Sequence, residues 1–334
     1  MRRFKFVLWV MVLCLASMGL VLTGCGQNSS DTTKIVLSEV THSVFYAPQY
    51  VALNLGYFEE EGLEVELING GGADKVMTSV ISGEAEIGLA GPEATIYVYL
   101  EGNPNHSIIF AQLTQRDGAF LVSREKIDNF SWDMLKGKYV IGGRVGGVPE
   151  MTFEYVLKQQ GIDIVNDLTL DTSISFALTP GAFTGGTGDF VTLFEPTASN
   201  IEQQGLGHVV ASIGEMSGYV PYTAYFANKD YMAENPEVIQ SFTNAVYKGQ
   251  QYCMTHTAAE IAEVVAPSFP DTDLPLLTDA IARYMSIDAW CSDPIMEKSS
   301  LEALEVIMES AGELDSRPVY EDIVNNSFAE EAMK

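Results

Sequence analysis

The chain has 334 residues and a formal net charge of −27 at pH 7, with 45 acidic against 18 basic residues. This excess of acid argues against nucleic acid as a partner, because binding to phosphate depends on Lys and Arg, and against electrostatic attachment to anionic lipid. A hydrophobic content of 47% is typical of a folded protein, and the length predicts two domains.

The first thirty residues have the layout of an export signal. A basic start, Met1 to Lys5, precedes an uncharged run from Phe6 to Leu22, which ends in Leu22-Thr23-Gly24-Cys25. The tetrapeptide resembles a bacterial lipobox, in which the cysteine is lipidated and becomes the mature N-terminus. We predict a lipoprotein signal peptide over 1–24, a flexible tether over 25–33 and a membrane-anchored, extracytoplasmic protein held by acyl chains on Cys25. An uncleaved transmembrane anchor is the alternative.

Strands and helices alternate through the first part of the mature chain. Period-2 and β-branched patterns predict strands at 34–40, 64–68, 86–90, 107–113 and 118–123. Near-helical spacing predicts helices at 48–57 and 74–82 and another beginning at Pro92. This alternation is typical of a parallel α/β sheet covered by helices.

A second unit of the same kind follows, and the chain then returns to the first. The patterns predict a short helix at 131–135, strands at 139–142, 168–170, 190–194 and 209–212, and helices at 149–160 and 196–204. A strand at 222–227 returns to the first sheet, and helices follow at 238–255, 258–265, 274–285, 294–310 and 319–328. We predict an α/β fold of two lobes, 34–120 plus 221–334 and 121–220, each a mixed, mainly parallel sheet flanked by helices. Two hinge crossovers, near 120–123 and 218–224, leave a ligand cleft between the lobes.

The cysteines and histidines give no metal or cofactor signal. Apart from Cys14 in the signal and Cys25, only Cys253 and Cys291 occur, and they form either one disulfide or two buried free thiols. The four histidines are scattered without the spacing of a metal site. We predict neither a metal nor a cofactor.

Four blocks of sequence, in order, resemble one known family. They are 45–58 with Glu61-Gly62-Leu63-Glu64-Val65, then Gly71-Gly72-Ala73 with 81–88, then 146–149 with 157–162, and finally 188–196. They are similar to substrate-binding proteins of ABC importers with the periplasmic binding protein type II fold. The nearest branch is the thiamine-pyrimidine, riboflavin-precursor and sulfonate/taurine/nitrate group.

The resemblance implies a two-lobed venus-flytrap protein that captures a small molecule and delivers it to ABC permease subunits in the membrane. Closure of such a cleft needs no chemistry, so we expect a binding protein and not an enzyme. We also expect the protein to be a monomer. A pyrimidine-synthase-like enzyme of the same fold is the main alternative, although 181–194 lacks the cysteine of that family's motif. A sensory ectodomain is a third class.

Candidate ligand-binding residues follow from the expected strand ends and helix starts. Aromatic rings can stack on a flat ligand, glycines before helices expose backbone N–H groups, and charged groups can pair with a polar ligand. The candidates are Phe45, Tyr46, Gly71, Gly72, Gly91, Glu93, Arg116, Gly146, Gly147, Glu195 and Tyr222.

The class of ligand is the least determined feature. Aromatic walls and a carboxylate at Glu195 favour an amino-bearing heterocycle, such as a pyrimidine or a vitamin precursor. An anion of the sulfonate, taurine or nitrate type is the alternative, with Arg116 and Arg144 as its best charged partners and helix N-termini as donors.

Overall fold

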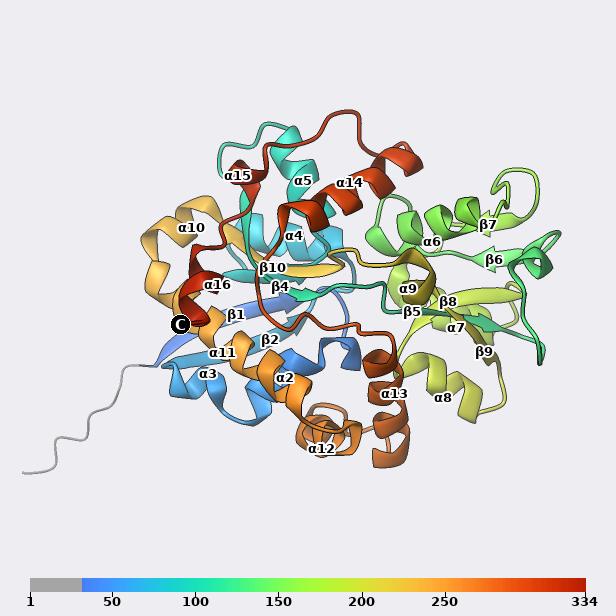
Figure 1. Cartoon of the computed structure of the whole chain (residues 1–334), viewed down its shortest axis with the longest axis horizontal. Coiled ribbons are helices and arrows are strands. Elements are labelled where there is room, and N and C mark those ends of the chain that lie inside the picture. The colour runs from blue at the N-terminus through green and yellow to red at the C-terminus, as the bar shows by residue number, and fades with distance from the viewer. Residues whose placement is uncertain (1–31) are drawn as a thin grey trace, which may run out of the picture. The chain divides into compact units, whose positions relative to one another are not determined.

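Two five-stranded sheets form the framework of the protein (Figure 1). The structure, a computed structural model, describes residues 32–334, of which 33–334 form one compact unit. The predicted signal peptide, the lipidation site at Cys25 and most of the tether lie outside the described residues. The first sheet has the order β2-β1-β3-β10-β4 and the second has the order β7-β6-β8-β5-β9.

Both sheets are mixed, as predicted. In the first sheet β1 pairs in parallel with β2 and β3, and β10 joins antiparallel to β3 and β4. In the second, β6 is parallel to β7 and β8, and β5 is antiparallel to β8 and β9. The strands are β1 (Thr33–Glu39), β2 (Leu63–Asn69), β3 (Ile87–Ala90), β4 (Ser107–Thr114), β5 (Ala119–Ser123), β6 (Tyr139–Ile141), β7 (Thr169–Asp171), β8 (Phe190–Phe194), β9 (His208–Ser212) and β10 (Thr223–Asn228).

Helices cover both faces of the first sheet and flank the second (Figure 1). The α-helices are α2 (Ala47–Asn54), α3 (Tyr57–Glu60), α4 (Ala73–Ser82), α5 (Glu93–Leu100), α6 (Val148–Gln159), α7 (Thr179–Thr184), α8 (Thr197–Gln203), α9 (Ile213–Ser217), α10 (Lys229–Glu234), α11 (Pro236–Thr255), α12 (Ala258–Val265), α13 (Leu274–Ser286), α14 (Lys298–Ala311), α15 (Tyr320–Ile323) and α16 (Ser327–Ala332). Short 3-10 helices are η1 (Val44–Tyr46), η2 (Trp132–Leu135), η3 (Phe176–Leu178) and η4 (Ala266–Ser268). Among these elements, no helix is both long and apolar enough to cross a membrane.

The chain passes between the two sheets twice. The first passage, 115–118, joins β4 to β5, and the second, 218–222, leads from α9 back to β10. The first passage lies before the predicted one, because residues 119–123 are a buried inner strand of the second sheet and not a linker. The domain limits at 120 and 220 stay a prediction.

The outer edge of β4 explains two wrong helix predictions in the C-terminal region. Trp290 pairs with Thr114, and the carbonyl of Pro294 accepts from Gln112 N, so α14 begins only at Lys298. Val324 pairs with Ile109 in a parallel bridge, whereas the Thr114–Trp290 bridge is antiparallel, and the Val324 pairing splits the helix predicted over 319–328 into α15 and α16. An edge strand offers unpaired backbone groups, and here the C-terminal segments satisfy them.

Helices α11 and α2 pack closely against each other beside the first sheet. A Cβ atom on Gly249 of α11 would lie 2.1 Å from the carbonyl oxygen of Pro48, so this crossing requires glycine.

Cys253 and Cys291 are both buried free thiols. Of the two alternatives that the sequence leaves open, one disulfide or two free thiols, the structure has the free thiols.

Candidate functional site

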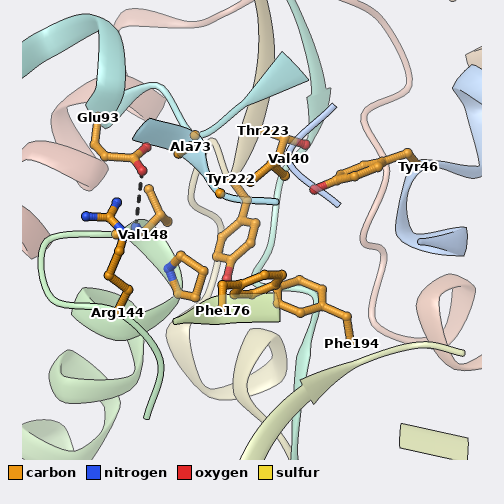
Figure 2. A pocket seen from close by; sticks show the side chains of 14 residues that line it. Val40, Tyr46, Ala73, Glu93, Arg144, Val148, Phe176, Phe194, Tyr222 and Thr223 are labelled. Atoms are coloured by element: carbon orange, nitrogen blue, oxygen red, sulfur yellow. Dashed lines mark hydrogen bonds between the residues drawn. The ribbon is translucent and has the colours of Figure 1, made fainter. Parts of the chain in front are cut away.

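A pocket lies between the two sheets and takes its lining from both (Figure 2). The first sheet and its helices contribute residues at the ends of β1 and β3, at the starts of α4 and α5, and at the start of β10. The second sheet and its neighbouring segments contribute the β6–α6 loop, η3 and the end of β8. This is where open α/β sheets bind ligands. The lining residues are Val40, Tyr46, Gly72, Ala73, Gly91, Glu93, Arg144, Gly147, Val148, Pro149, Phe176, Phe194, Tyr222 and Thr223.

The pocket is narrow in this structure. Its cavity volume is about 50 Å³, whereas pockets that bury a drug-sized ligand measure roughly 300–1,000 Å³. The lobes also contact each other beside it, because the Tyr97 hydroxyl donates to the Gly146 carbonyl at 3.0 Å. The structure therefore corresponds to a closed cleft, and a ligand larger than a few waters enters only when the cleft widens.

Aromatic rings form one wall of the pocket. Figure 2 shows Tyr46, Tyr222, Phe176 and Phe194 around the same space, with the Tyr46 hydroxyl pointing inward. The Phe176 and Phe194 ring centroids are 5.5 Å apart, and those of Phe194 and Tyr222 are 6.1 Å apart. Rings at such distances and angles offer both flat faces and edges to a planar ligand.

Glu93 is the buried carboxyl group among the residues that line this pocket. Its side chain is 2% exposed, and its Oε1 accepts a hydrogen bond from Val148 N at 3.4 Å (Figure 2). Its Oε2 is buried without any hydrogen-bond partner among the described residues. Burial raises the pKa of Glu93 from 4.5 to about 7, while the Val148 N–H and the charge of Arg144 act in the opposite direction.

Arg144 brings a cationic group to the opposite side of the pocket. It follows β6, is partly exposed, and lies 3.7 Å from Asp74 through its Nε. Figure 2 shows its guanidinium pointing toward Glu93 from the second lobe. The pocket thus carries one negative and one positive group, contributed by different lobes.

The structure places six of the eleven predicted binding residues in the pocket lining. These are Tyr46, Gly72, Gly91, Glu93, Gly147 and Tyr222. Gly71 and Gly146 are next to lining residues but do not line the pocket themselves. Phe45 is fully buried behind it, with its ring 5.4 Å from that of Tyr46 and 5.6 Å from that of Tyr222.

Glu195 and Arg116 make contacts within the protein. The Glu195 carboxylate is fully buried, accepts from Ser199 N and Oγ at 2.9 Å, and pairs with Arg283 Nη1 at 2.7 Å. Arg116 donates to the Gly214 carbonyl and its guanidinium lies 4.0 Å above the Tyr219 ring. The predicted roles of both residues in ligand binding remain untested predictions.

Several lining residues were not predicted from the sequence. Phe176 lies in η3, inside a polar, glycine-rich segment that gave no signal for a wall residue. Phe194 directly precedes Glu195, and adjacent residues in extended chain point to opposite faces. The end of β8 is thus the correct place, but Phe194 and not Glu195 lines this pocket, whereas both residues line an adjoining cavity.

A second, more polar cavity of about 250 Å³ adjoins the pocket. It shares Phe176 and Phe194 with the pocket and includes Thr41, His42 and Asn69. Among residues 32–334, no cluster of His, Cys, Asp and Glu side chains has the arrangement of a metal site.

His42, at the rim of this second cavity, is held by two acceptors. Its Nδ1 lies 2.9 Å from Glu39 Oε1 and its Nε2 lies 2.7 Å from the Ser268 carbonyl oxygen. An imidazole can donate to both only when both nitrogens carry protons. The hydrogen bond to Glu39 raises the pKa of His42, although burial lowers it.

We expect the stabilising effect of His42 to depend on pH. A raised pKa in the folded state means that this contribution is complete below about pH 6.5 and disappears as the pH rises through the folded-state pKa. Urea unfolding of H42Q should therefore show its largest loss of stability near pH 5.5 and little loss near pH 9. The matched control is H256Q, whose ring stacks on Tyr252 at the surface. Equal losses for H42Q at both pH values would contradict the assigned imidazolium.

Comparison with known proteins identifies relatives in sequence and in structure. Residues 44–259 match the family described as NMT1/THI5 like. The protein YtlA of Bacillus subtilis, named as a binding protein, is 44% identical over 319 residues, which are 95% of each chain. The 4-amino-5-hydroxymethyl-2-methylpyrimidine phosphate synthase of Aspergillus parasiticus is 26% identical over 246 residues, 70% of this chain and 71% of that one.

Solved structures show the same fold at low identity. The alkanesulfonate-binding protein SsuA of Xanthomonas axonopodis pv. citri, bound to MOPS, aligns with a TM-score of 0.72 and 14% identity over 88% of this chain and 99% of that one. The nitrate-binding protein NrtA of Synechocystis PCC 6803 aligns with a TM-score of 0.68 and 14% identity over 90% and 88%. The chain therefore has the periplasmic binding protein fold and belongs to the NMT1/THI5-like family.

Proposed function

We propose that this protein is the extracytoplasmic solute-binding component of an ABC importer, which captures a small molecule between its lobes and delivers it to the permease. The observation that carries the proposal is the pocket itself, because its walls come from two sheets joined by two short passages. Such a site opens and closes by a hinge motion, and ligand shifts the balance toward the closed form. The similarity to YtlA supports a binding role.

The export signal fits this role. Lipidation of Cys25 would hold the acidic protein at the extracytoplasmic face of the membrane through acyl chains. Residues 25–33 would then act as a tether that keeps a monomeric receptor near its permease. Mass spectrometry of the protein extracted from membranes tests the anchor, since an unmodified Cys25 would contradict it.

The pocket favours a planar ligand that carries an N–H donor. Four aromatic rings offer stacking surfaces, and Glu93 Oε2 offers a buried acceptor that no described residue satisfies. We therefore retain the amino-bearing heterocycle, such as a pyrimidine, as the proposed ligand class. A sulfonate or nitrate would have to rely on Arg144 and backbone donors and would meet the carboxylate of Glu93.

An enzyme of the pyrimidine-synthase type is the second candidate, because a 26% identical relative is named as such an enzyme. The more similar relative, at 44% identity, is named as a binding protein. Incubation of the chain with candidate substrates, followed by product analysis, distinguishes stoichiometric binding from turnover.

A thermal-shift screen of the full chain tests the ligand class. We expect 4-amino-5-hydroxymethyl-2-methylpyrimidine or a related aminopyrimidine to raise the melting temperature, since a ligand at 100 times its Kd stabilises by about 2.7 kcal/mol. Taurine, alkanesulfonates and nitrate form the comparison set. Stabilisation by these anions with none by the pyrimidines would show that the proposed ligand class is wrong.

Two variants of one short helix give the screen a matched control. Phe176 lines the pocket, whereas Leu178, two residues later in η3, is 65% exposed. We expect F176A to weaken binding of the pyrimidine about tenfold through the lost ring contact, while L178A leaves binding unchanged. Equal affinity of both variants would place the ligand elsewhere.

A further inference from the structure

One oxygen of Glu93 is buried and unsatisfied in the pocket where the two lobes meet. Glu93 begins α5, beside the first sheet, whereas its hydrogen-bond partner Val148 begins α6, beside the second. Oε1 is thereby engaged across the cleft, and Oε2 is left in the pocket without a partner among residues 32–334.

Gly91 makes room for this carboxylate. A Cβ atom on Gly91 would lie 1.9 Å from Glu93 Oε2 and 2.8 Å from Val148 Cγ2. Any side chain at position 91 would therefore displace the carboxylate or push the lobes apart. Glycine here leaves Oε2 facing the pocket while the backbone of α6 lies close by.

An empty closed cleft is unfavourable with this arrangement. A buried carboxylate oxygen without a hydrogen bond loses its hydration and gains nothing in return. The groups around Glu93 offset only part of this penalty. The N–H groups of Val148, Glu93 and Ala94 and the charge of Arg144 lower its pKa, yet burial is the larger effect and raises the pKa to about 7. The phenols of Tyr46, Tyr97 and Tyr222 lie near the carboxylate as well. Opening of the cleft restores water to Oε2.

We propose that Glu93 couples closure of the cleft to a ligand that donates a hydrogen bond from an amino or ring N–H group to Oε2. This inference rests on the proposed binding function and names the residue that selects the ligand. A donor satisfies the one group that opposes closure, so such a ligand binds the closed form preferentially. Above about pH 7, where Glu93 is ionised, a sulfonate or nitrate oxygen would instead face Oε2 with another acceptor and leave it unsatisfied.

Glu93→Gln tests the proposal with almost no change of shape. The amide oxygen of the glutamine would accept from Val148 N, so its NH2 group would take the place of Oε2 and present a donor. We expect the E93Q chain to bind 4-amino-5-hydroxymethyl-2-methylpyrimidine roughly 10- to 150-fold more weakly, the range for loss of a hydrogen bond to a charged group. Calorimetric titration at about pH 8, where Glu93 is ionised, measures this ratio.

Glu150→Gln is the matched control. Glu150 is also a glutamate of 4% exposure, it accepts from Gly146 N, and it does not line the pocket. We expect E150Q to bind the same pyrimidine within about threefold of the wild type. Unchanged affinity of E93Q, with binding by the wild type intact, would overturn the role of Glu93 and leave the binding function standing. Binding of taurine or nitrate alone by the wild type would overturn both.

A second measurement requires no ligand. Small-angle X-ray scattering of the ligand-free full chain should give a smaller radius of gyration for E93Q than for the wild type, because the amide lowers the penalty of closure. E150Q should match the wild type. Identical radii for E93Q and the wild type would overturn the proposed coupling, whatever the ligand is.

Discussion

Replacing Arg283 with methionine is expected to lower the free energy of unfolding by about 3 kcal/mol, because it leaves a buried carboxylate without its counter-charge. Arg283, on α13, donates from Nη1 to Glu195 Oε1 at 2.7 Å and from Nη2 to Glu202 Oε2 at 2.8 Å. The Glu195 side chain is fully buried, and only the N–H and hydroxyl of Ser199 would remain as its partners. Urea denaturation measures the loss.

Lys34 provides the control for this prediction. Its Nζ lies 3.0 Å from Glu64 Oε1, and the two side chains are 78% and 57% exposed. Exposed ion pairs contribute roughly 0–1 kcal/mol, so K34M should have little effect. Adding Glu195→Gln to R283M should recover part of the stability, since the unpaired charge disappears. A loss below 1 kcal/mol for R283M would contradict the account of Glu195 as a charge held by Arg283.

The ion pair between Arg283 and Glu195 could not be predicted from the sequence. A carboxylate after an apolar strand, at a carboxyl end, satisfies the general rule for binding sites in open sheets. The sequence contains no signal that α13, nearly ninety residues later, brings an arginine to the same point. Long-range pairing of this kind depends on the tertiary fold and has no local pattern.

The strands and most helices were predictable because their patterns are local. Residues 190–194 and 258–265 match β8 and α12 at both ends, since an apolar run and a capped amphipathic repeat each leave a clear mark. The errors at 294–297 and 319–328 occur where the edge of β4 competes for the backbone. Helical propensity in those segments is weaker than the requirement to pair that edge.

The glycines that follow strands and precede helices correctly predicted part of the pocket lining. Gly72, Gly91 and Gly147 each precede or begin a helix that faces the cleft, and this position follows from the alternation of strand and helix. Phe176 could not be found in this way, because η3 is a single turn within a polar segment. Whether a residue of such an irregular segment lines the pocket depends on the tertiary structure, which no local sequence pattern indicates.

Asp117→Asn is expected to stabilise the protein at high pH by roughly 5 kcal/mol, the largest gain predicted here. Asp117 is fully buried in the passage between β4 and β5, and burial raises its pKa from 3.8 to about 8, even though the Ala119 N–H bonded to Oδ1 lowers it. The buried hydroxyl of Tyr222 adjoins the carboxylate and also lowers its pKa, but burial is the larger effect. Asparagine keeps the acceptor for Ala119 and removes the buried charge.

The sign of this effect follows from proton linkage. A raised pKa means that the folded wild type binds a proton more tightly than the unfolded chain, so its stability is complete below pH 3.8 and falls as the pH rises through about 8. The difference between D117N and the wild type should therefore be small at pH 4 and largest near pH 9, where a shift of about four units corresponds to roughly 5 kcal/mol. Denaturant unfolding at both pH values measures it.

Asp163 offers a control of opposite sign. It is exposed, and its hydrogen bonds from Asn166 and Val165 lower its pKa. The ionised form is thus the stabilising one, so D163N should lose stability at neutral and high pH and lose none near pH 2. If D117N and D163N changed stability in the same direction at pH 9, the buried charge in the passage between the sheets would not be the cause. Opposite directions at pH 9 would support the ionised, buried carboxylate of Asp117 as the cause of the gain in stability.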